Sequence, residues 1–321
     1  MKIAVRFPGP GSQYLGLGQE FVNADTESAS LLAMAEATCE LKLGALSAVG
    51  PMEELTRATN LQPAITITNL ICWQALKKEL NGDAAVSCFA GHSLGEYSAL
   101  YAAGVINAED TMRLVSKRGA LMEREGTINP GGMRAVLGLD IDTIEEVISN
   151  YQGPGKVTAA NHNTPDQIVI SGSFHALDEV SKIAEEKGGK VIPLNVSVAN
   201  HSPLVAGAVP DFAEFLEKIE FKKPEVPVYF NLSAAKETEI GNIKEIMANQ
   251  IASRVRWCEI IEAMLSEGVD TFIEVGPKTV LKGLIKKIIP KGTGIKVTSL
   301  QFDTPASLSL CMEKIRNGKC E

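Results

Sequence analysis

The stretch AAVSCFAGHSLGEYSAL, residues 84–100, decides the fold of this chain. A short apolar run (84–90) leads directly into GHSLG (91–95), and an Ala- and Leu-rich stretch follows. This order predicts a strand, a sharp turn and a helix, with Ser93 at the turn. Gly91 and Gly95 are the small residues that such a strained turn needs. Ser93 is therefore a candidate nucleophile at a helix N-terminus, where free N–H groups stabilise an oxyanion. The alternative is a tight turn with an incidental serine.

The remaining chain divides by texture into two kinds of unit. Residues 133–196 give the order strand, helix, strand, strand, helix, strand, which predicts a ferredoxin-like unit. The rest predicts a hydrolase-like α/β domain with a parallel sheet, so we expect the small unit to be an insertion. The expected boundaries are 1–127 and 199–321 for the two parts of the large domain, and 128–198 for the insertion. Expected strands of the small unit cover 133–138, 156–161, 167–172 and 190–196, and those of the large domain 2–7, 84–90, 226–231, 271–275 and 295–300.

Composition excludes several classes of protein. The 321 residues carry a net charge of -8, which argues against nucleic-acid binding because phosphates require a basic surface. No apolar run reaches the roughly 18 residues that span a bilayer, and no signal sequence is evident at the N-terminus. We therefore expect a cytoplasmic monomer without membrane contact. The six cysteines lack C-x-x-C spacing, so neither a disulfide framework nor a metal site is expected.

A serine hydroxyl needs a base, and the chain has four histidines. His92 adjoins Ser93, but neighbouring side chains diverge at a sharp turn. His162 lies in an expected loop with Asn161 and Asn163, and His175 lies near a helix N-terminus, where the dipole lowers basicity. His201, where the insertion returns to the large domain, is the best candidate. Its alternative role is to cap the following helix. No acidic partner is evident nearby, so we expect a backbone carbonyl to orient it.

Arg118 is the second candidate. The expected helix 109–125 carries an apolar stripe, and Arg118 shares its face, whereas Arg113, Lys117 and Arg124 lie on the opposite face. A buried guanidinium needs a partner. That partner is either an internal Asp or Glu or the carboxylate of a substrate.

Seven segments together give the chain a clear resemblance. It resembles the malonyl-CoA:acyl carrier protein transacylases of bacterial type II fatty acid synthesis over nearly its whole length. The segments that carry the resemblance are FPGPGSQ (7–13), GHSLGE (91–96), Arg118 before Gly119, Asn161 with QIVISG (167–172), His201, Gln250 before VRW (255–257), and EVGP (274–277).

The resemblance implies a reaction and a site. Ser93 would attack a malonyl thioester of coenzyme A, His201 would act as base and then acid, and the Gln250 main-chain carbonyl would orient His201. Arg118 would hold the free carboxylate, and the Leu94 N–H would bind the oxyanion. The malonyl group would pass to the phosphopantetheine thiol of acyl carrier protein without a metal or redox cofactor. Further residues implied in substrate binding are Asn161, Gln167 and Met133.

Two residues depart from the family pattern. Pro10 replaces a glutamine whose backbone N–H would be the second oxyanion donor, and proline has no N–H. We hypothesise that Gly11 N–H or a shifted loop replaces it. Arg134 replaces a small residue and is either solvated or narrows the pocket.

A basic segment is the expected docking surface for the acidic carrier. Between Glu274 and Asp303 there are six lysines and no acid, and Lys282, Lys286 and Lys287 are the main candidates; the others are Lys278, Lys291 and Lys296. Its alternative is an ordinary solvated face.

The alternatives for function are an acyl hydrolase on the same scaffold and a carrier-binding homologue disabled by Pro10. The sequence also leaves open malonyl against methylmalonyl, and fatty acid against polyketide synthesis.

Overall fold

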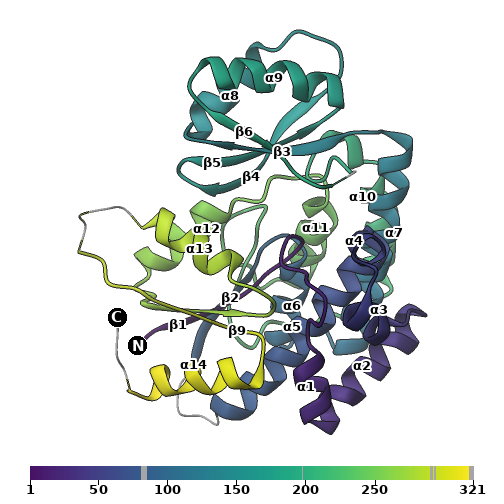
Figure 1. The fold of residues 1–321 in the computed structure, drawn as a ribbon, viewed down its shortest axis with the longest axis vertical. Coiled ribbons are helices and arrows are strands. Elements are labelled where there is room, and N and C mark those ends of the chain that lie inside the picture. The colour runs from purple at the N-terminus through teal and green to yellow at the C-terminus, as the bar shows by residue number, and fades with distance from the viewer. Residues whose placement is uncertain (81–84, 197, 290–291, 293, 318–321) are drawn as a thin grey trace.

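The computed structural model describes residues 1–80, 85–196, 198–289, 292 and 294–317. Figure 1 shows two layered units, with β1 (Ile3–Phe7) and α14 (Pro305–Asn317), the first and last elements described, on the larger one. This confirms the expected mixed α/β class with a parallel sheet and a separate antiparallel sheet.

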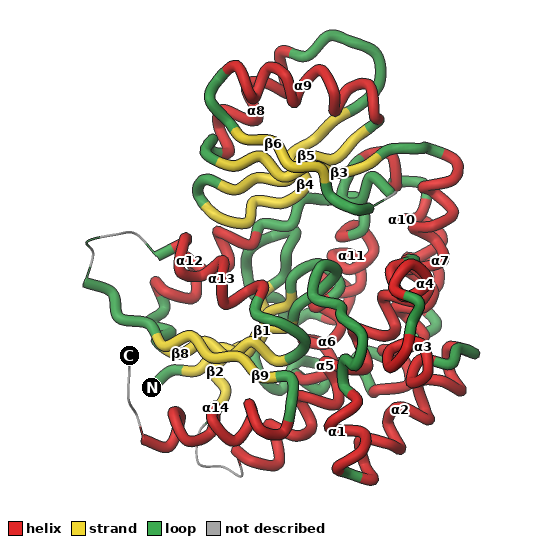
Figure 2. The backbone as a smooth tube through the Cα atoms, viewed as in Figure 1, coloured by secondary structure: helices red, strands yellow, loops and turns green. Residues whose placement is uncertain are grey.

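The larger unit is built on a five-stranded parallel sheet in the order β7-β2-β1-β8-β9. Side chains alternate between its faces: Ile3, Val5 and Phe7 point into one core, and Ala4 points into the other. Helices therefore cover both faces, as an all-parallel sheet requires (Figure 2). The strands are β1 (Ile3–Phe7), β2 (Val86–Gly91), β7 (Val228–Tyr229), β8 (Thr271–Val275) and β9 (Thr298–Phe302).

The helices of the larger unit come from both ends of the chain. Those before the small unit are α1 (Gln19–Ala24), α2 (Thr26–Cys39), α3 (Leu43–Val49), α4 (Met52–Thr56), α5 (Ala58–Leu80), α6 (Gly95–Ala102) and α7 (Ala108–Ile128). Those after it are η1 (Pro203–Val205), α10 (Ala208–Glu217), α11 (Ile240–Gln250), α12 (Trp257–Ser266), α13 (Val280–Ile288) and α14 (Pro305–Asn317). None of the helices described is long and apolar enough to cross a bilayer.

The smaller unit is an antiparallel sheet in the order β4-β5-β3-β6, with α8 and α9 on one face. Its element order is the expected ferredoxin-like one. The opposite sheet face carries Met133, Ala135, Ala160 and Val169. Its elements are β3 (Gly132–Leu137), α8 (Ile141–Asn150), β4 (Val157–Thr164), β5 (Gln167–Gly172), α9 (Phe174–Glu186) and β6 (Lys190–Pro193).

Several expected elements differ from the structure. The expected loop at Asn161, His162 and Asn163 is wrong, because these residues lie in β4, which pairs with β5 as far as Thr164. The expected strand 190–196 ends at Pro193, although Leu194 N–H still donates to Met133 O of β3 (3.0 Å). The helix expected after His201 divides into η1 and α10. The strand expected at 84–90 begins at Val86, and Ala84 lies outside the described residues.

Strand β4 also joins the two units. His162 donates its backbone N–H to Val255 O (2.9 Å), and Val255 donates to Ala160 O (2.8 Å). Strand β4 contacts α12 and α13 of the larger unit as well. The buried polar residues of β4 therefore lie where the small sheet meets the larger unit.

Candidate active site

The turn after β2 is fixed by two interlocking glycines. A Cβ on Gly91 would lie 1.9 Å from the carbonyl carbon of Gly95, and a Cβ on Gly95 would lie 2.1 Å from Phe7 O. Neither position has room for a side chain. Ser93 between them has a left-handed backbone with φ 52°, which non-glycine residues rarely adopt. The expected strand, sharp turn and helix are thus present, with α6 beginning at Gly95.

Asn231 holds the strained turn in place. Its Oδ1 accepts a hydrogen bond from Ser93 N–H (2.7 Å), and its Nδ2 donates to Gly91 O (2.7 Å). The Asn231 N–H in turn donates to Glu96 Oε1 (2.6 Å). Such over-determination is what keeps an unfavourable backbone conformation occupied.

His201 is the histidine that reaches Ser93. Its Nε2 lies 2.7 Å from Ser93 Oγ, while its Nδ1 lies 3.0 Å from both Gln250 O and Ser253 O. Two carbonyl oxygens can only accept, so Nδ1 carries the proton and Nε2 is free to take one from Ser93. Burial and the charge of Arg118 lower the pKa of His201 to about 3, so the ring is neutral at pH 7.

The other three histidines lie elsewhere. His92 Nε2 is 2.8 Å from Asn163 Oδ1, so its ring turns away from Ser93 as expected. His162 Nδ1 is 3.2 Å from a carboxylate oxygen of Glu259. His175 is exposed on α9.

Arg118 is buried beside the nucleophile, with 1% of its surface exposed. Its Nη2 donates to Ser93 Oγ (3.2 Å) and to Gln250 Oε1 (3.1 Å), and its Nη1 donates to Gln62 Oε1 (2.8 Å). Among the described ion pairs none involves Arg118, so the first of the two partners considered, an internal carboxylate in direct contact, is not found. The guanidinium charge is therefore available to an anionic ligand.

The first loop of the chain lies against the turn. A Cβ on Gly9 would lie 2.7 Å from His92 O and 3.6 Å from Leu94 N. In the hydrogen bonds of the described residues, Leu94 N–H has no acceptor, as expected for a donor that faces a substrate. Gly11 N–H instead donates to Gln13 Oε1 (2.8 Å), so it must leave Gln13 before it can bind an oxyanion.

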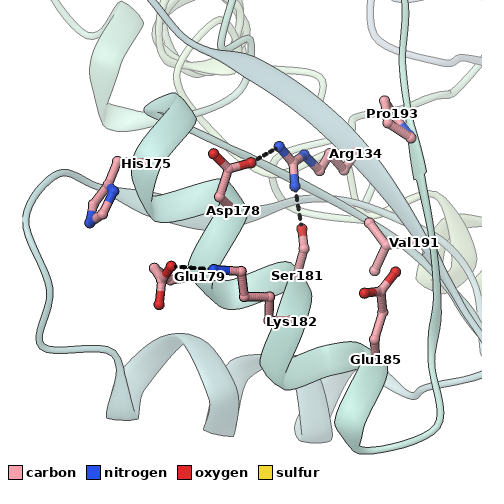
Figure 3. Close-up of a pocket in the computed structure, with 9 residues that line it drawn as sticks. All are labelled: Arg134, His175, Asp178, Glu179, Ser181, Lys182, Glu185, Val191 and Pro193. Atoms are coloured by element: carbon pink, nitrogen blue, oxygen red, sulfur yellow. Dashed lines mark hydrogen bonds and ion pairs between the residues drawn. The ribbon is translucent and has the colours of Figure 1, made fainter.

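Arg134 does not narrow the space around Ser93. It lies on the helix-covered face of the small sheet, opposite Met133, and its guanidinium pairs with Asp178 and donates to Ser181 Oγ (3.0 Å) on α9. Figure 3 shows it pointing toward α9 in a surface pocket that His175 also lines.

The expected substrate-binding and partner-binding residues divide into two groups. Met133 and Asn161 are buried at the face and edge of the small sheet that meet the larger unit. Gln167 instead lies beside α13, where its Oε1 is 3.4 Å from Lys287 Nζ. Lys286 and Lys287 are exposed on α13 and Lys282 is half-buried, whereas Lys291 lies outside the described residues.

Four polar residues around Ser93 were missed by the sequence reasoning: Gln62, Glu96, Asn231 and the side chain of Gln250. For two of these residues the sequence held a feature that could have identified them. Asn231 lies two residues after β7, at the carboxyl edge of a parallel sheet, where functional residues collect. Gln62 lies in the buried stretch of α5, where a polar side chain needs a hydrogen-bond partner.

The fold and this site define a serine enzyme that transfers acyl groups, with a histidine base oriented by main-chain carbonyls. The sequence profile of the acyl transferase domain matches residues 6–300. The chain belongs to the acyl transferase domain family.

Its relatives are similar over their full lengths. The malonyl CoA-acyl carrier protein transacylase of Bacillus subtilis (strain 168) is 38% identical, and the alignment covers 98% of both chains. The acyl-carrier-protein S-malonyltransferase of Burkholderia pseudomallei 1710b is 37% identical with a TM-score of 0.91, covering 98% of this chain and 100% of that one. A malonyl-transacylase in complex with a type II polyketide acyl-carrier protein is 34% identical with a TM-score of 0.92, covering 98% and 100%.

Proposed function

We propose that this protein moves a malonyl group from coenzyme A to the phosphopantetheine thiol of acyl carrier protein through a malonyl ester on Ser93. The names of the relatives support this activity. The observation that carries the proposal is the position of Arg118, whose guanidinium is 3.2 Å from the nucleophile and has no carboxylate partner among the described ion pairs.

The distance between cation and nucleophile fits a short diacid. In a malonyl thioester the carboxylate carbon and the thioester carbonyl carbon are only about 2.5 Å apart, by ordinary carbon–carbon bond lengths and angles. A carboxylate paired with Arg118 therefore places the thioester carbonyl next to Ser93 Oγ. A neutral acyl chain would leave the buried guanidinium without a counter-ion.

In the first half-reaction, Ser93 Oγ attacks the thioester carbonyl and His201 Nε2 takes the hydroxyl proton. Leu94 N–H stabilises the oxyanion of the tetrahedral intermediate. The intermediate collapses, the carbon–sulfur bond breaks, and the proton on His201 passes to the departing coenzyme A thiolate. The products are free coenzyme A and malonyl-Ser93.

In the second half-reaction the carrier thiol takes the place of coenzyme A. His201 removes the thiol proton, the thiolate attacks the ester carbonyl, and the proton returns to Ser93 Oγ as malonyl carrier protein leaves. One thioester replaces another, so the exchange is nearly thermoneutral. We accordingly propose that it needs no metal or redox cofactor. We also propose that the protein acts as a cytoplasmic monomer.

The carrier protein is proposed to dock at α13. A carrier protein accompanies the related malonyl-transacylase in its solved complex. The exposed face of α13 presents Lys286 and Lys287, while Leu281, Leu284, Ile285 and Ile288 are buried behind it. A local basic face offsets the repulsion between an acidic carrier and a chain of net charge -8.

The two alternatives fit the site less well. An acyl hydrolase that acts on neutral chains has no use for a buried cation beside its nucleophile. A disabled carrier-binding homologue would have no reason to keep Ser93 and His201 at 2.7 Å with the proton of His201 on Nδ1.

Incubation with radiolabelled malonyl-CoA, with and without holo carrier protein, tests the proposal. Label should accumulate on Ser93 without the carrier and move to the carrier when it is added. Ser93→Ala should carry no label. Loss of label to water at the same rate in both cases would indicate a hydrolase, and no label on the wild type would indicate a disabled protein.

A further inference from the structure

We infer that Glu96 is a positioning residue: it fixes the side-chain amide of Gln250, and Gln250 in turn holds Arg118 in place for the acyl carboxylate. This inference rests on the proposed function, since it concerns how the same site selects a charged acyl group. Glu96 is fully buried on α6, one turn after Ser93, and no step of the reaction described above uses it.

The amide of Gln250 lies between one donor and two acceptors. Its Nε2 donates to Ser93 O (2.8 Å) and to Glu96 Oε2 (2.6 Å), while its Oε1 accepts from Arg118 Nη2 (3.1 Å). A flipped amide would bring its oxygen against two other oxygens and its NH₂ against the guanidinium. The two acceptors therefore set which end of the amide faces Arg118.

Of these two acceptors, Glu96 is the one that a side-chain change can remove. Ser93 O belongs to the main chain and also accepts from Glu96 N–H (3.1 Å). With Glu96 in place, a hydrogen-bonded chain of carboxyl, amide and guanidinium crosses the site without any direct ion pair. The amide separates Glu96 from Arg118, so the cation is oriented and still free to bind a substrate carboxylate.

Glu96 also accepts a second hydrogen bond, on the side of the Ser93 turn. The experiment must separate its effect from that of the bond with Gln250. Its Oε1 accepts from Asn231 N–H (2.6 Å), and Asn231 holds the Ser93 turn. In Glu96→Gln the amide oxygen can still accept from Asn231, but the new NH₂ group faces Gln250 Nε2. The substitution thus keeps the shape of the side chain and the hydrogen bond with Asn231, which leads to the nucleophile. It breaks the hydrogen bond with Gln250, which leads to Arg118.

Two probes report separately on the effects of these two hydrogen bonds. The ratio of kcat/KM for malonyl-CoA to that for acetyl-CoA reports on Arg118, because acetyl lacks the carboxylate. The rate constant for inactivation by phenylmethanesulfonyl fluoride, a neutral serine reagent, reports on Ser93 and His201. Glu96→Gln should lower the ratio by about 10-fold to 100-fold, as expected for one broken buried hydrogen bond, and change the inactivation rate by less than about 3-fold.

Glu125→Gln is the matched control. Glu125 is also a buried glutamate, but it pairs with Arg124 and touches neither Gln250 nor Arg118. This variant should keep the wild-type ratio.

A second variant keeps the test decisive if Glu96→Gln does not fold. Gln250→Met removes the amide but keeps the main-chain carbonyl that orients His201, so it should give the same split between the two probes. Adding Glu96→Gln to Gln250→Met should lower the ratio no further, because Glu96 acts through that amide.

The inference is overturned if Glu96→Gln keeps the wild-type ratio, if both probes fall together, or if the double variant is additive. Its failure is distinct from failure of the proposed function. If only this inference fails, the wild type still transfers malonyl to the carrier. If the proposed function fails, the wild type does not.

Discussion

The guanidinium of Arg118 and the hydroxyl of Ser93 are hydrogen-bonded to each other, with Nη2 3.2 Å from Oγ. The group proposed to select the acyl chain thus directly contacts the group proposed to attack it. This contact couples selectivity to reactivity, because the charge on Arg118 also acts on His201.

Replacing Arg118 should remove the preference for a charged acyl group. For Arg118→Gln we expect kcat/KM for malonyl-CoA to fall by about 10²–10³-fold, as for one partner lost from a buried ion pair, while the value for acetyl-CoA falls far less. Steady-state kinetics with both thioesters measure this. Arg113→Gln, an exposed arginine of the same helix, is the control. Equal losses with the two thioesters would contradict the assigned role.

The pH at which Ser93 loses reactivity on acidification, the acid limb of its pH profile, should lie well below the ordinary pKa of histidine. Burial and then Arg118 lower the pKa of His201 to about 3, and a base with a lowered pKa stays neutral until the pH falls to that value. Inactivation by phenylmethanesulfonyl fluoride should therefore be independent of pH between about pH 5 and about pH 8. In Arg118→Gln the limb should move up toward 6.5, the ordinary value. A wild-type limb already at that value would refute the prediction.

Adding an N–H at position 10 should speed acylation. Gly11 N–H is occupied by Gln13 in this structure, and Pro10 has no N–H to offer. Pro10→Gln is therefore expected to raise the rate constant for malonylation of Ser93, by up to about 10²-fold for one oxyanion donor. Rapid-quench measurement of labelled enzyme gives this rate. An unchanged rate would instead support Gly11 as the second donor, and Gln13→Leu would then be the variant to examine.

Stability should depend on pH through Glu96. Burial raises the pKa of Glu96 to about 8 against the lowering effects of Asn231, Gln250 and Arg118. Between 4.5, its ordinary value, and about 8 the folded state binds more protons than the unfolded state, so the free energy of unfolding falls as pH rises through that window. Urea denaturation at several pH values should show a shallower fall for Glu96→Gln. Identical slopes for the two proteins would show that Glu96 is ionised throughout.

Charge reversal on α13 tests the docking surface. Lys286→Glu with Lys287→Glu should raise KM for holo carrier protein by about 10-fold or more at low salt, because opposite charges become like charges, and should leave KM for malonyl-CoA unchanged. Lys182→Glu with Lys187→Glu makes the same charge change on two exposed lysines, one on α9 and one directly after it. If the two double variants behave alike, net charge explains the effect and α13 has no special part.

Much of this architecture could be predicted because short-range rules govern it. GHSLG forces a turn whatever surrounds it, and the apolar stripe of α7 places Arg118 inside. What could not be predicted depends on contacts across the fold. Residues Asn161, His162 and Asn163 read as a loop because they are polar, yet β5 and the backbone of Val255 hold them in a strand. The roles of Gln62 and Asn231 arise from partners 56 and 138 residues distant in the chain, which no local pattern contains.

The two acceptors that orient His201 are carbonyls of the main chain, and every amino acid supplies that group. Sequence drift at positions 250 and 253 therefore leaves the reactive tautomer intact. Gln250 contributes one of those carbonyls, but the hydrogen bond of its side chain with Arg118 is lost when another amino acid replaces it. If Gln250 acts as proposed, divergence at this one position alters which acyl groups are accepted without extinguishing the ability to acylate, which is a route by which a family of this kind can acquire new substrates.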